Sequence, residues 1–99
     1  MTAYVIYQGE VSDPERYEAY KRAAAASVTA AGGRYIVRGG GVEVLEGDAP
    51  SGRTVVSEFP SMEAALTWYH GPDYTEARRL REGAAVVAHM YIVEGADPA

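Results

Sequence analysis

The chain of 99 residues contains no cysteine, and only one tryptophan and one phenylalanine stand among its hydrophobic residues. Without cysteine, disulfides and thiolate chemistry are both excluded. No apolar run is long enough to span a bilayer, so no membrane association is expected. Residues 1–8 lack the basic, apolar and small-residue order of a secretory signal, which predicts a cytoplasmic location.

Positive charge is also scarce, because nine Lys and Arg residues face fourteen Asp and Glu residues, giving a net charge of -5. An acidic chain is repelled by phosphate backbones, so nucleic acid is not an expected partner. The densest basic run, Arg78, Arg79 and Arg81, lies beside Glu76 and Glu82 and is interpreted as a solvated helix face.

Motifs of several enzyme classes are missing. The chain has no P-loop, no G-x-S-x-G elbow and no pair of histidines at ligand spacing. Phosphoryl transfer, nucleophilic hydrolysis and a transition-metal site therefore lack a sequence basis, and neither a metal nor a cofactor is expected.

The pattern that remains predicts one domain over residues 1–95, followed by a disordered tail over 96–99. Runs rich in β-branched and aromatic residues indicate strands, and apolar residues at three- and four-residue steps indicate helices. Asp13, Pro14 and Ser61 are typical helix starts, and Gly32 is a typical helix end. The expected strands are 3–11, 34–47, 53–60 and 84–95, and the expected helices fill 14–31, 62–70 and roughly 72–82.

Three successive glycines, 39–41, pose the question of a phosphate-binding loop. A dinucleotide-binding loop needs a helix directly after its glycines, whereas the sequence VEVLE alternates with period two. Val44 also stands where the third glycine of G-x-G-x-x-G belongs. The glycines are therefore interpreted as a bend or bulge within a long strand over 34–47, paired as a hairpin that places Glu46 opposite Arg53.

The order βαββαβ predicts an α+β, ferredoxin-like sandwich, a four-stranded antiparallel sheet with helices on one face. The strands carry apolar residues at both parities, for example Val5 beside Ile6 and Ile92 beside Val93. Both faces of the sheet therefore need cover. A small chain gains the missing cover by meeting a second copy, so a homodimer is expected.

Several segments resemble one family over nearly the whole chain: "DPERYEAYK", "AAGGRYIVRGG", "EVLEGDAPSGRTVVSEFPSMEAALTWYHGPDYTEARRLREGAA" and the terminal "IVEG". They are similar to domain-of-unknown-function family 1330, a branch of the dimeric α+β barrel superfamily. The resemblance implies a homodimer whose two sheets form a barrel, with small-molecule pockets between sheet and helices. Members of the superfamily include cofactor-independent monooxygenases, lactone isomerases, polyketide-cyclising proteins and haem proteins.

Three polar residues within apolar strands are the candidate catalytic groups, namely His89, Glu58 and Arg38. His89 or Glu58 would move a proton next to a carbonyl, and Arg38 would stabilise the developing oxyanion. By strand parity, His89 shares a face with Val87 and Tyr91. The alternative is structural: a histidine satisfied by one hydrogen bond at a contact, and charges placed where strands fray or paired elsewhere in the domain.

Aromatic side chains on the helices are the candidate substrate-binding groups, because aromatic walls with a hydroxyl at one end suit a flat organic ligand. Eight tyrosines against one phenylalanine favour a polar-lined cavity, since each buried hydroxyl needs a partner. The alternative is a tyrosine stripe that belongs to the core. The sequence thus supports either a cofactor-independent isomerase, cyclase or monooxygenase, or a non-catalytic ligand-binding or accessory module. The substrate-binding candidates are Tyr20, Trp68, Tyr69 and Tyr74.

Overall fold

The computed structural model describes residues 1–96 and confirms the expected order of strands and helices. Apart from Ala96, the expected tail lies outside the described residues. The elements are β1 (Ala3–Val11), α1 (Pro14–Ala30), β2 (Arg34–Arg38), β3 (Arg53–Phe59), α2 (Met62–His70), α3 (Pro72–Arg81) and β4 (Ala85–Glu94).

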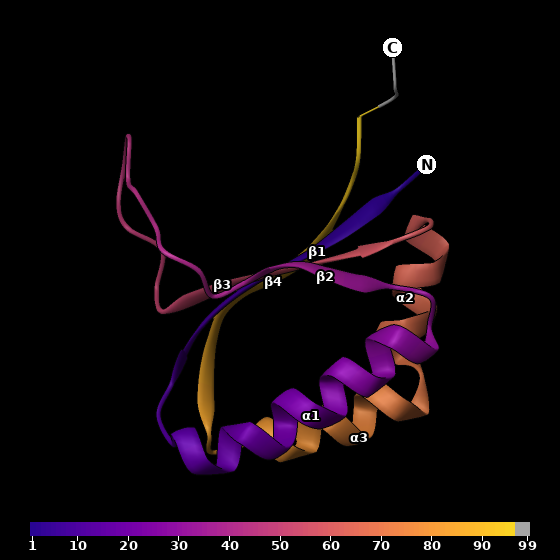
Figure 1. Cartoon of the computed structure of the whole chain (residues 1–99), viewed down its shortest axis with the longest axis horizontal. Helices are drawn as coiled ribbons and strands as arrows, with labels where there is room; N and C mark the ends of the chain where they lie inside the picture. The colour runs from indigo at the N-terminus through magenta and orange to yellow at the C-terminus, as the bar shows by residue number, and fades with distance from the viewer. Residues whose placement is uncertain (97–99) are drawn as a thin grey trace.

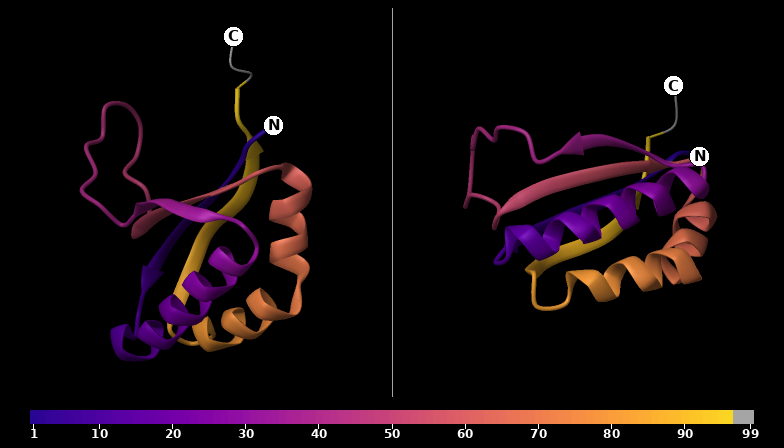
Figure 2. Two further views of the ribbon diagram at one scale, coloured as in Figure 1. Left: turned by 45° about the vertical axis from the view of Figure 1, so that its right-hand side comes forward. Right: turned by 60° about the horizontal axis from the view of Figure 1, so that its bottom comes forward.

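The four strands form one antiparallel sheet in the order β2-β3-β1-β4. All three helices cover the same face of this sheet, and α1 and α3 run side by side beneath it (Figures 1 and 2). The molecule is therefore a two-layer sandwich whose second sheet face carries no helix. No helix of residues 1–96 combines the length and the apolar character needed to cross a membrane.

Local signals place the helix ends where the sequence predicts them. The Asp13 carboxylate accepts a hydrogen bond of 3.2 Å from the backbone N–H of Arg16, and Pro14 occupies the first helical turn. At the other end, Gly32 adopts φ +82°, a left-handed conformation that costs glycine little. The backbone N–H of Gly33 then donates to the carbonyl of Val28, which closes α1.

The second strand is shorter than predicted, and the proposed hairpin over residues 42–46 is wrong. Gly39 has φ +70°, so the chain turns left-handed there and β2 ends at Arg38. Residues 39–52 form a long loop that extends beyond the edge of the sheet on the left of Figure 1. Arg38, not a residue near Val44, lies opposite Val55 in the sheet.

Two register shifts, neither foreseen from the sequence, change which side chains share a face. One lies between Tyr35 and Val37 on β2, and the other lies opposite Gln8 and Gly9 of β1, where Ala88 of β4 is skipped. As a result Val87 turns toward the helices while His89 does not, so the predicted common face of these two residues is wrong. A bulge of one residue reverses the alternation of every side chain beyond it.

The core lies between the helices and the sheet and is unusually aromatic. Its buried members come from all three helices, from β1 and β3, and from the turn before β4: Val5, Tyr17, Tyr20, Ala24, Val28, Phe59, Ala65, Trp68, Tyr74, Ala77 and Ala84. On the opposite face of the sheet, Ile6 of β1 lies between Val56 and Tyr91 of its neighbours. Tyr91 is 52% exposed, so the apolar centre of this second face is uncovered within one copy of the chain.

Candidate ligand-binding cavity

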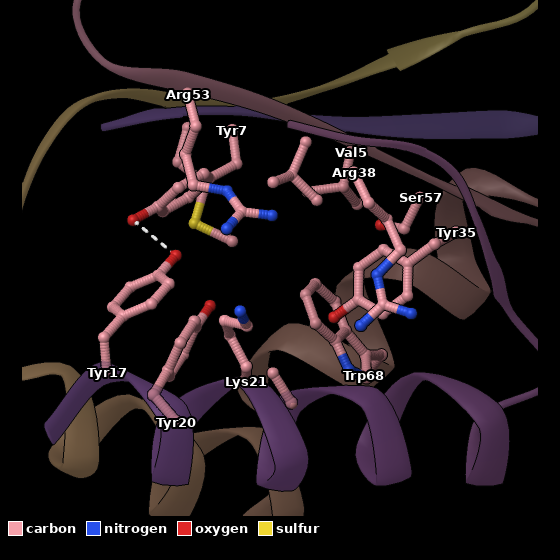
Figure 3. A pocket seen from close by; sticks show the side chains of 13 residues that line it. Val5, Tyr7, Tyr17, Tyr20, Lys21, Tyr35, Arg38, Arg53, Ser57 and Trp68 are labelled. Carbon is pink, nitrogen blue, oxygen red and sulfur yellow. Dashed lines mark hydrogen bonds between the residues drawn. The ribbon is translucent and has the colours of Figure 1, made fainter. Parts of the chain in front are cut away.

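A cavity lies between α1 and the sheet, roofed by β1 and β3 and closed at one end by α2 (Figure 3). Its volume of about 40 Å³ leaves room for two or three water molecules. The lining residues are Val5, Tyr7, Tyr17, Tyr20, Lys21, Ala24, Tyr35, Arg38, Arg53, Val55, Ser57, Trp68 and Met90.

The floor of the cavity follows from helical periodicity. Tyr17, Tyr20, Lys21 and Ala24 occur at steps of three and four residues, which brings them to one face of α1. Three of them are buried, whereas Lys21 is half-buried and lies where the helix surface meets solvent. Ala24 is the smallest of the four, and its short side chain leaves part of the space between helix and sheet open.

Hydroxyl groups in the core are paired, which explains how so many tyrosines are buried. Tyr17 donates a hydrogen bond of 3.3 Å to the hydroxyl of Tyr7, and the hydroxyls of Tyr20 and Tyr74 lie 2.8 Å apart. The guanidinium of Arg81 donates to the Tyr74 hydroxyl at 3.0 Å. Arg81 therefore belongs to this network, and its interpretation as part of a solvated helix face is wrong.

The single tryptophan forms the end wall of the cavity and is held on several sides. Its indole N–H donates to the Ser27 hydroxyl at 3.0 Å. Its ring centroid lies 4.2 Å from that of Tyr74 and 5.1 Å from that of Phe59. Trp68 is 6% exposed, so it presents a fixed aromatic surface to whatever enters.

The phenols of Tyr20 and Tyr35 stay protonated at neutral pH. Burial raises the pKa of Tyr35 to about 12. Burial, together with the neighbouring hydroxyl of Tyr74, also raises the pKa of Tyr20. Since a general base must be deprotonated near the working pH, these tyrosines can orient a ligand by hydrogen bonds but do not accept its proton.

Positively charged side chains also line the cavity. Lys21, Arg38 and Arg53 line the cavity, and no Asp or Glu is among its lining residues. The guanidinium of Arg38 lies 4.6 Å from the ring centroid of Tyr35, a cation–π contact. The Nε atom of Arg53 is buried and has no hydrogen-bond partner among residues 1–96.

The first of the three glycines has a role in placing Arg53. A Cβ atom added at Gly39 would lie 3.0 Å from the guanidinium of Arg53, closer than most Cβ contacts. Gly40 and Gly41 have open space around them. The glycine run thus ends β2 and lets Arg53 lie against the backbone, and no helix N-terminus follows it to form a phosphate site.

The structure divides the residues predicted from the sequence into two groups. Arg38, Tyr20 and Trp68 line the cavity. Tyr74 lies behind Tyr20 and contacts it through its hydroxyl, whereas Tyr69 lies in an outer groove along α2.

Glu58 and His89 lie on the other face of the sheet. Glu58 accepts a hydrogen bond of 3.2 Å from Arg34, its partner across the strands. His89 lies opposite Gln8 and lines a shallow groove with residues 48–51 of the long loop. Neither side chain can reach a molecule held beneath the sheet, because the sheet separates them from it.

Sequence reasoning missed Tyr7, Tyr35 and Arg53 as cavity residues. Tyr7 and Tyr35 lie on strands, whereas the predicted aromatic walls came only from helices. Arg53 was predicted to lie opposite Glu46 in a hairpin, which depended on the wrong length of the second strand. Alternation along β1 carried the missing signal, since Val5 and Tyr7 share the helix-facing parity.

No group of three or more His, Asp or Glu side chains comes together within residues 1–96.

The strand order, the antiparallel pairing and the placement of helices on one face define a ferredoxin-like α+β protein. Solved structures with this architecture match almost the whole chain. A protein of unknown function from Rhodopseudomonas palustris has 21% identity and a TM-score of 0.70, covering 98% of this chain and 84% of its own. SnoaB, a cofactor-independent oxygenase from Streptomyces nogalater, has 10% identity and a TM-score of 0.62, with 97% and 94% covered. A dimeric ferredoxin-like protein of unknown function from Bacteroides fragilis has 10% identity and a TM-score of 0.55, with 95% of both chains covered.

The sequence profile of one family, the domain of unknown function DUF1330, matches residues 2–96. The chain therefore belongs to this family, as the resemblance implied. No curated protein matches the chain.

Proposed function

We propose that this protein binds a small, flat organic molecule in the cavity between α1 and the sheet. The observation that carries the proposal is the wall of rigid aromatic rings, Tyr20, Tyr35 and Trp68, around an unfilled space whose rim is formed by the polar side chains of Lys21 and Arg38. Ligand sites of this kind combine an apolar lining with a few polar groups that fix orientation.

Entry of a ligand requires the rim to move. A space of about 40 Å³ is far smaller than the several hundred Å³ of a typical ligand pocket. Lys21 is half-buried and Arg38 is exposed, so both side chains can rotate into solvent at little cost. Their departure would join the inner space to the open surface above it.

Binding is better supported than proton transfer. The cavity lining contains no His, Asp or Glu, so a substrate proton would have to leave to water. Arg38 alone of the three proposed catalytic residues could act there, by stabilising an oxyanion. A catalytic role for His89 or Glu58 would place the reaction on the uncovered face of the sheet. The likeness to a cofactor-independent oxygenase, at 10% identity, supports the fold and is compatible with either function.

The proposal includes a second copy of the chain as partner and a cytoplasmic location. The apolar, helix-free face of the sheet, with Ile6 and Tyr91 at its centre, supports a homodimer in which two sheets stack.

Filling the cavity should weaken ligand binding. Ala24 lines it and is 1% exposed, so Ala24→Leu places extra methyl groups in the open space. We expect the affinity for 2-naphthoate, a flat aromatic acid, to fall at least tenfold, measured by NMR titration of the Trp68 indole N–H. The chain has one tryptophan, so this signal reports the end wall of the cavity.

The matched control is Ala26→Leu, the same change on the exposed side of α1. It should bind 2-naphthoate as the parent protein does. If Ala24→Leu folds, as judged by its amide spectrum, and binds with unchanged affinity, the ligand does not occupy this cavity.

A further inference from the structure

We infer that the cavity takes its ligand as an anion, with Arg53 as the residue that holds the negative group and Arg38 and Lys21 beside it. The inference rests on the proposed function and adds the substrate class: a flat organic acid bound through a carboxylate or another oxyanion.

The cavity is lined by positively charged side chains, although the whole chain carries a net negative charge. The protein carries a net charge of -5, yet the cavity lining has three cations and no carboxylate. Outside the cavity, Arg34 and Arg79 form ion pairs, with Glu58 at 3.2 Å and with Glu76 at 3.6 Å. Arg78 and Arg81 donate hydrogen bonds to tyrosine hydroxyls. Neither Arg38 nor Arg53 forms such an ion pair within the described residues.

Of these three cations, Arg53 has the least favourable environment. Its Nε atom is buried and unpartnered, and burying a polar group of a cation without a hydrogen bond is unfavourable. Its guanidinium lies 5.9 Å from the ring centroid of Tyr17 and close against Gly39, contacts that supply no acceptor oxygen for Nε. An anion in the cavity would supply the acceptor that the protein does not.

The other two cations lie where they reinforce this effect. Figure 3 shows Arg53 reaching down from the sheet and Lys21 reaching up from α1 toward the same space, with Arg38 and Tyr35 at the side. Lys21 also pairs with Glu18 at 3.0 Å on the helix surface, so its charge is partly offset. Arg53 and Arg38, which come from neighbouring strands, are therefore the principal binding groups.

The chemistry of the guanidinium group restricts the class of ligand further. Arginine recognises carboxylates through two parallel N–H donors, a geometry that a planar acid satisfies well. The remaining lining is aromatic, with Trp68 as the end wall and Tyr20 on the floor. A flat ring or unsaturated chain carrying one carboxylate matches both parts of the cavity.

The test compares 2-naphthoate with 2-naphthamide, which has nearly the same shape but no charge, by NMR titration of the full chain. We expect naphthoate to bind at least tenfold more tightly. Arg53→Gln should remove most of that preference without weakening naphthamide. Arg53→Lys should retain part of it, since the charge stays while the two-donor geometry is lost.

Arg79→Gln is the matched control, because it removes one positive charge at a position that is 70% exposed and away from the cavity. It should leave the preference unchanged. In the parent protein the preference should also shrink as salt is added, a readout that needs no substitution.

The outcomes separate the two proposals. Equal affinities for naphthoate and naphthamide in the parent protein would overturn the anion inference and leave the proposed binding function intact. Binding of neither compound would overturn both. An equal loss of preference in Arg53→Gln and Arg79→Gln would show that overall charge, and not Arg53, attracts the acid.

Discussion

Tyr74→Ala is expected to lower the free energy of unfolding by about 3 to 5 kcal/mol, as large aromatic truncations in cores do. Tyr74 is 1% exposed and contacts Trp68, Tyr20 and Arg81. Removing it opens a void beneath the cavity and leaves the Arg81 guanidinium without its hydroxyl acceptor. For a small domain with roughly 5 to 15 kcal/mol of stability, the loss would be a large fraction of the whole.

Chemical denaturation measures the loss in the free energy of unfolding. Two further variants separate the contribution of the hydroxyl from that of the buried ring. Tyr74→Phe keeps the ring and removes the hydroxyl, so its cost should be about 1 to 3 kcal/mol, the penalty for unsatisfied buried polar groups. Leu80→Ala, on the same helix at a site 39% exposed, should cost much less than Tyr74→Ala. A Tyr74→Ala protein as stable as Leu80→Ala would contradict the packing described for the aromatic core.

Ile6→Glu is expected to convert the proposed dimer to a monomer. Ile6 lies in the middle of the uncovered sheet face, between Val56 and Tyr91. An unpaired carboxylate placed inside an interface between two sheets is strongly unfavourable. Sedimentation analysis should show the mass fall from about twice 10.6 kDa to 10.6 kDa.

Leu80→Glu provides the control, because it introduces the same charge at an exposed apolar site on the helical layer. It should remain dimeric. The parent protein should also unfold at a temperature that rises with its concentration, as expected for a folded dimer in equilibrium with unfolded chains. A parent protein that is monomeric and stable at micromolar concentration would reject the stacked-sheet dimer.

The helix and strand boundaries that depend on nearby residues were predictable from the sequence. Asp13 and Ser61 accept hydrogen bonds from the backbone N–H groups of Arg16 and Ala64, as expected of N-cap residues. Gly71 and Pro72 separate α2 from α3 as the sequence indicates. These features depend on residues close together in the chain, so a single sequence contains the whole signal.

The end of the second strand was not predictable in the same way. The alternation of residues 42–46 is typical of a strand, but a strand also needs a partner. Most of β3 is already paired, because Arg34 through Arg38 of β2 lie opposite Val55 through Glu58. Val44 is instead 46% exposed in the loop. Pairing over a distance, and bulges such as the one at Ala88, depend on the assembled sheet.

The candidate site was also predicted only in part, because some of its residues depend on how the strands pair in the assembled sheet. Tyr20 and Trp68 were predicted as aromatic binding groups on helices, and the excess of tyrosine over phenylalanine favoured a polar-lined cavity. Charged residues in strands were recognised as unusual, but their faces depended on the two register shifts. Arg38 therefore lies at the cavity, whereas His89 lies on the far side of the sheet.

A crystal structure of the protein with 2-naphthoate would show directly whether the ligand lies in the space between α1 and the sheet. We expect the aromatic ring to lie between Tyr20 and Trp68, with the carboxylate within hydrogen-bonding distance of Arg53. Naphthoate bound on the uncovered sheet face beside His89, with the cavity closed and empty, would contradict it.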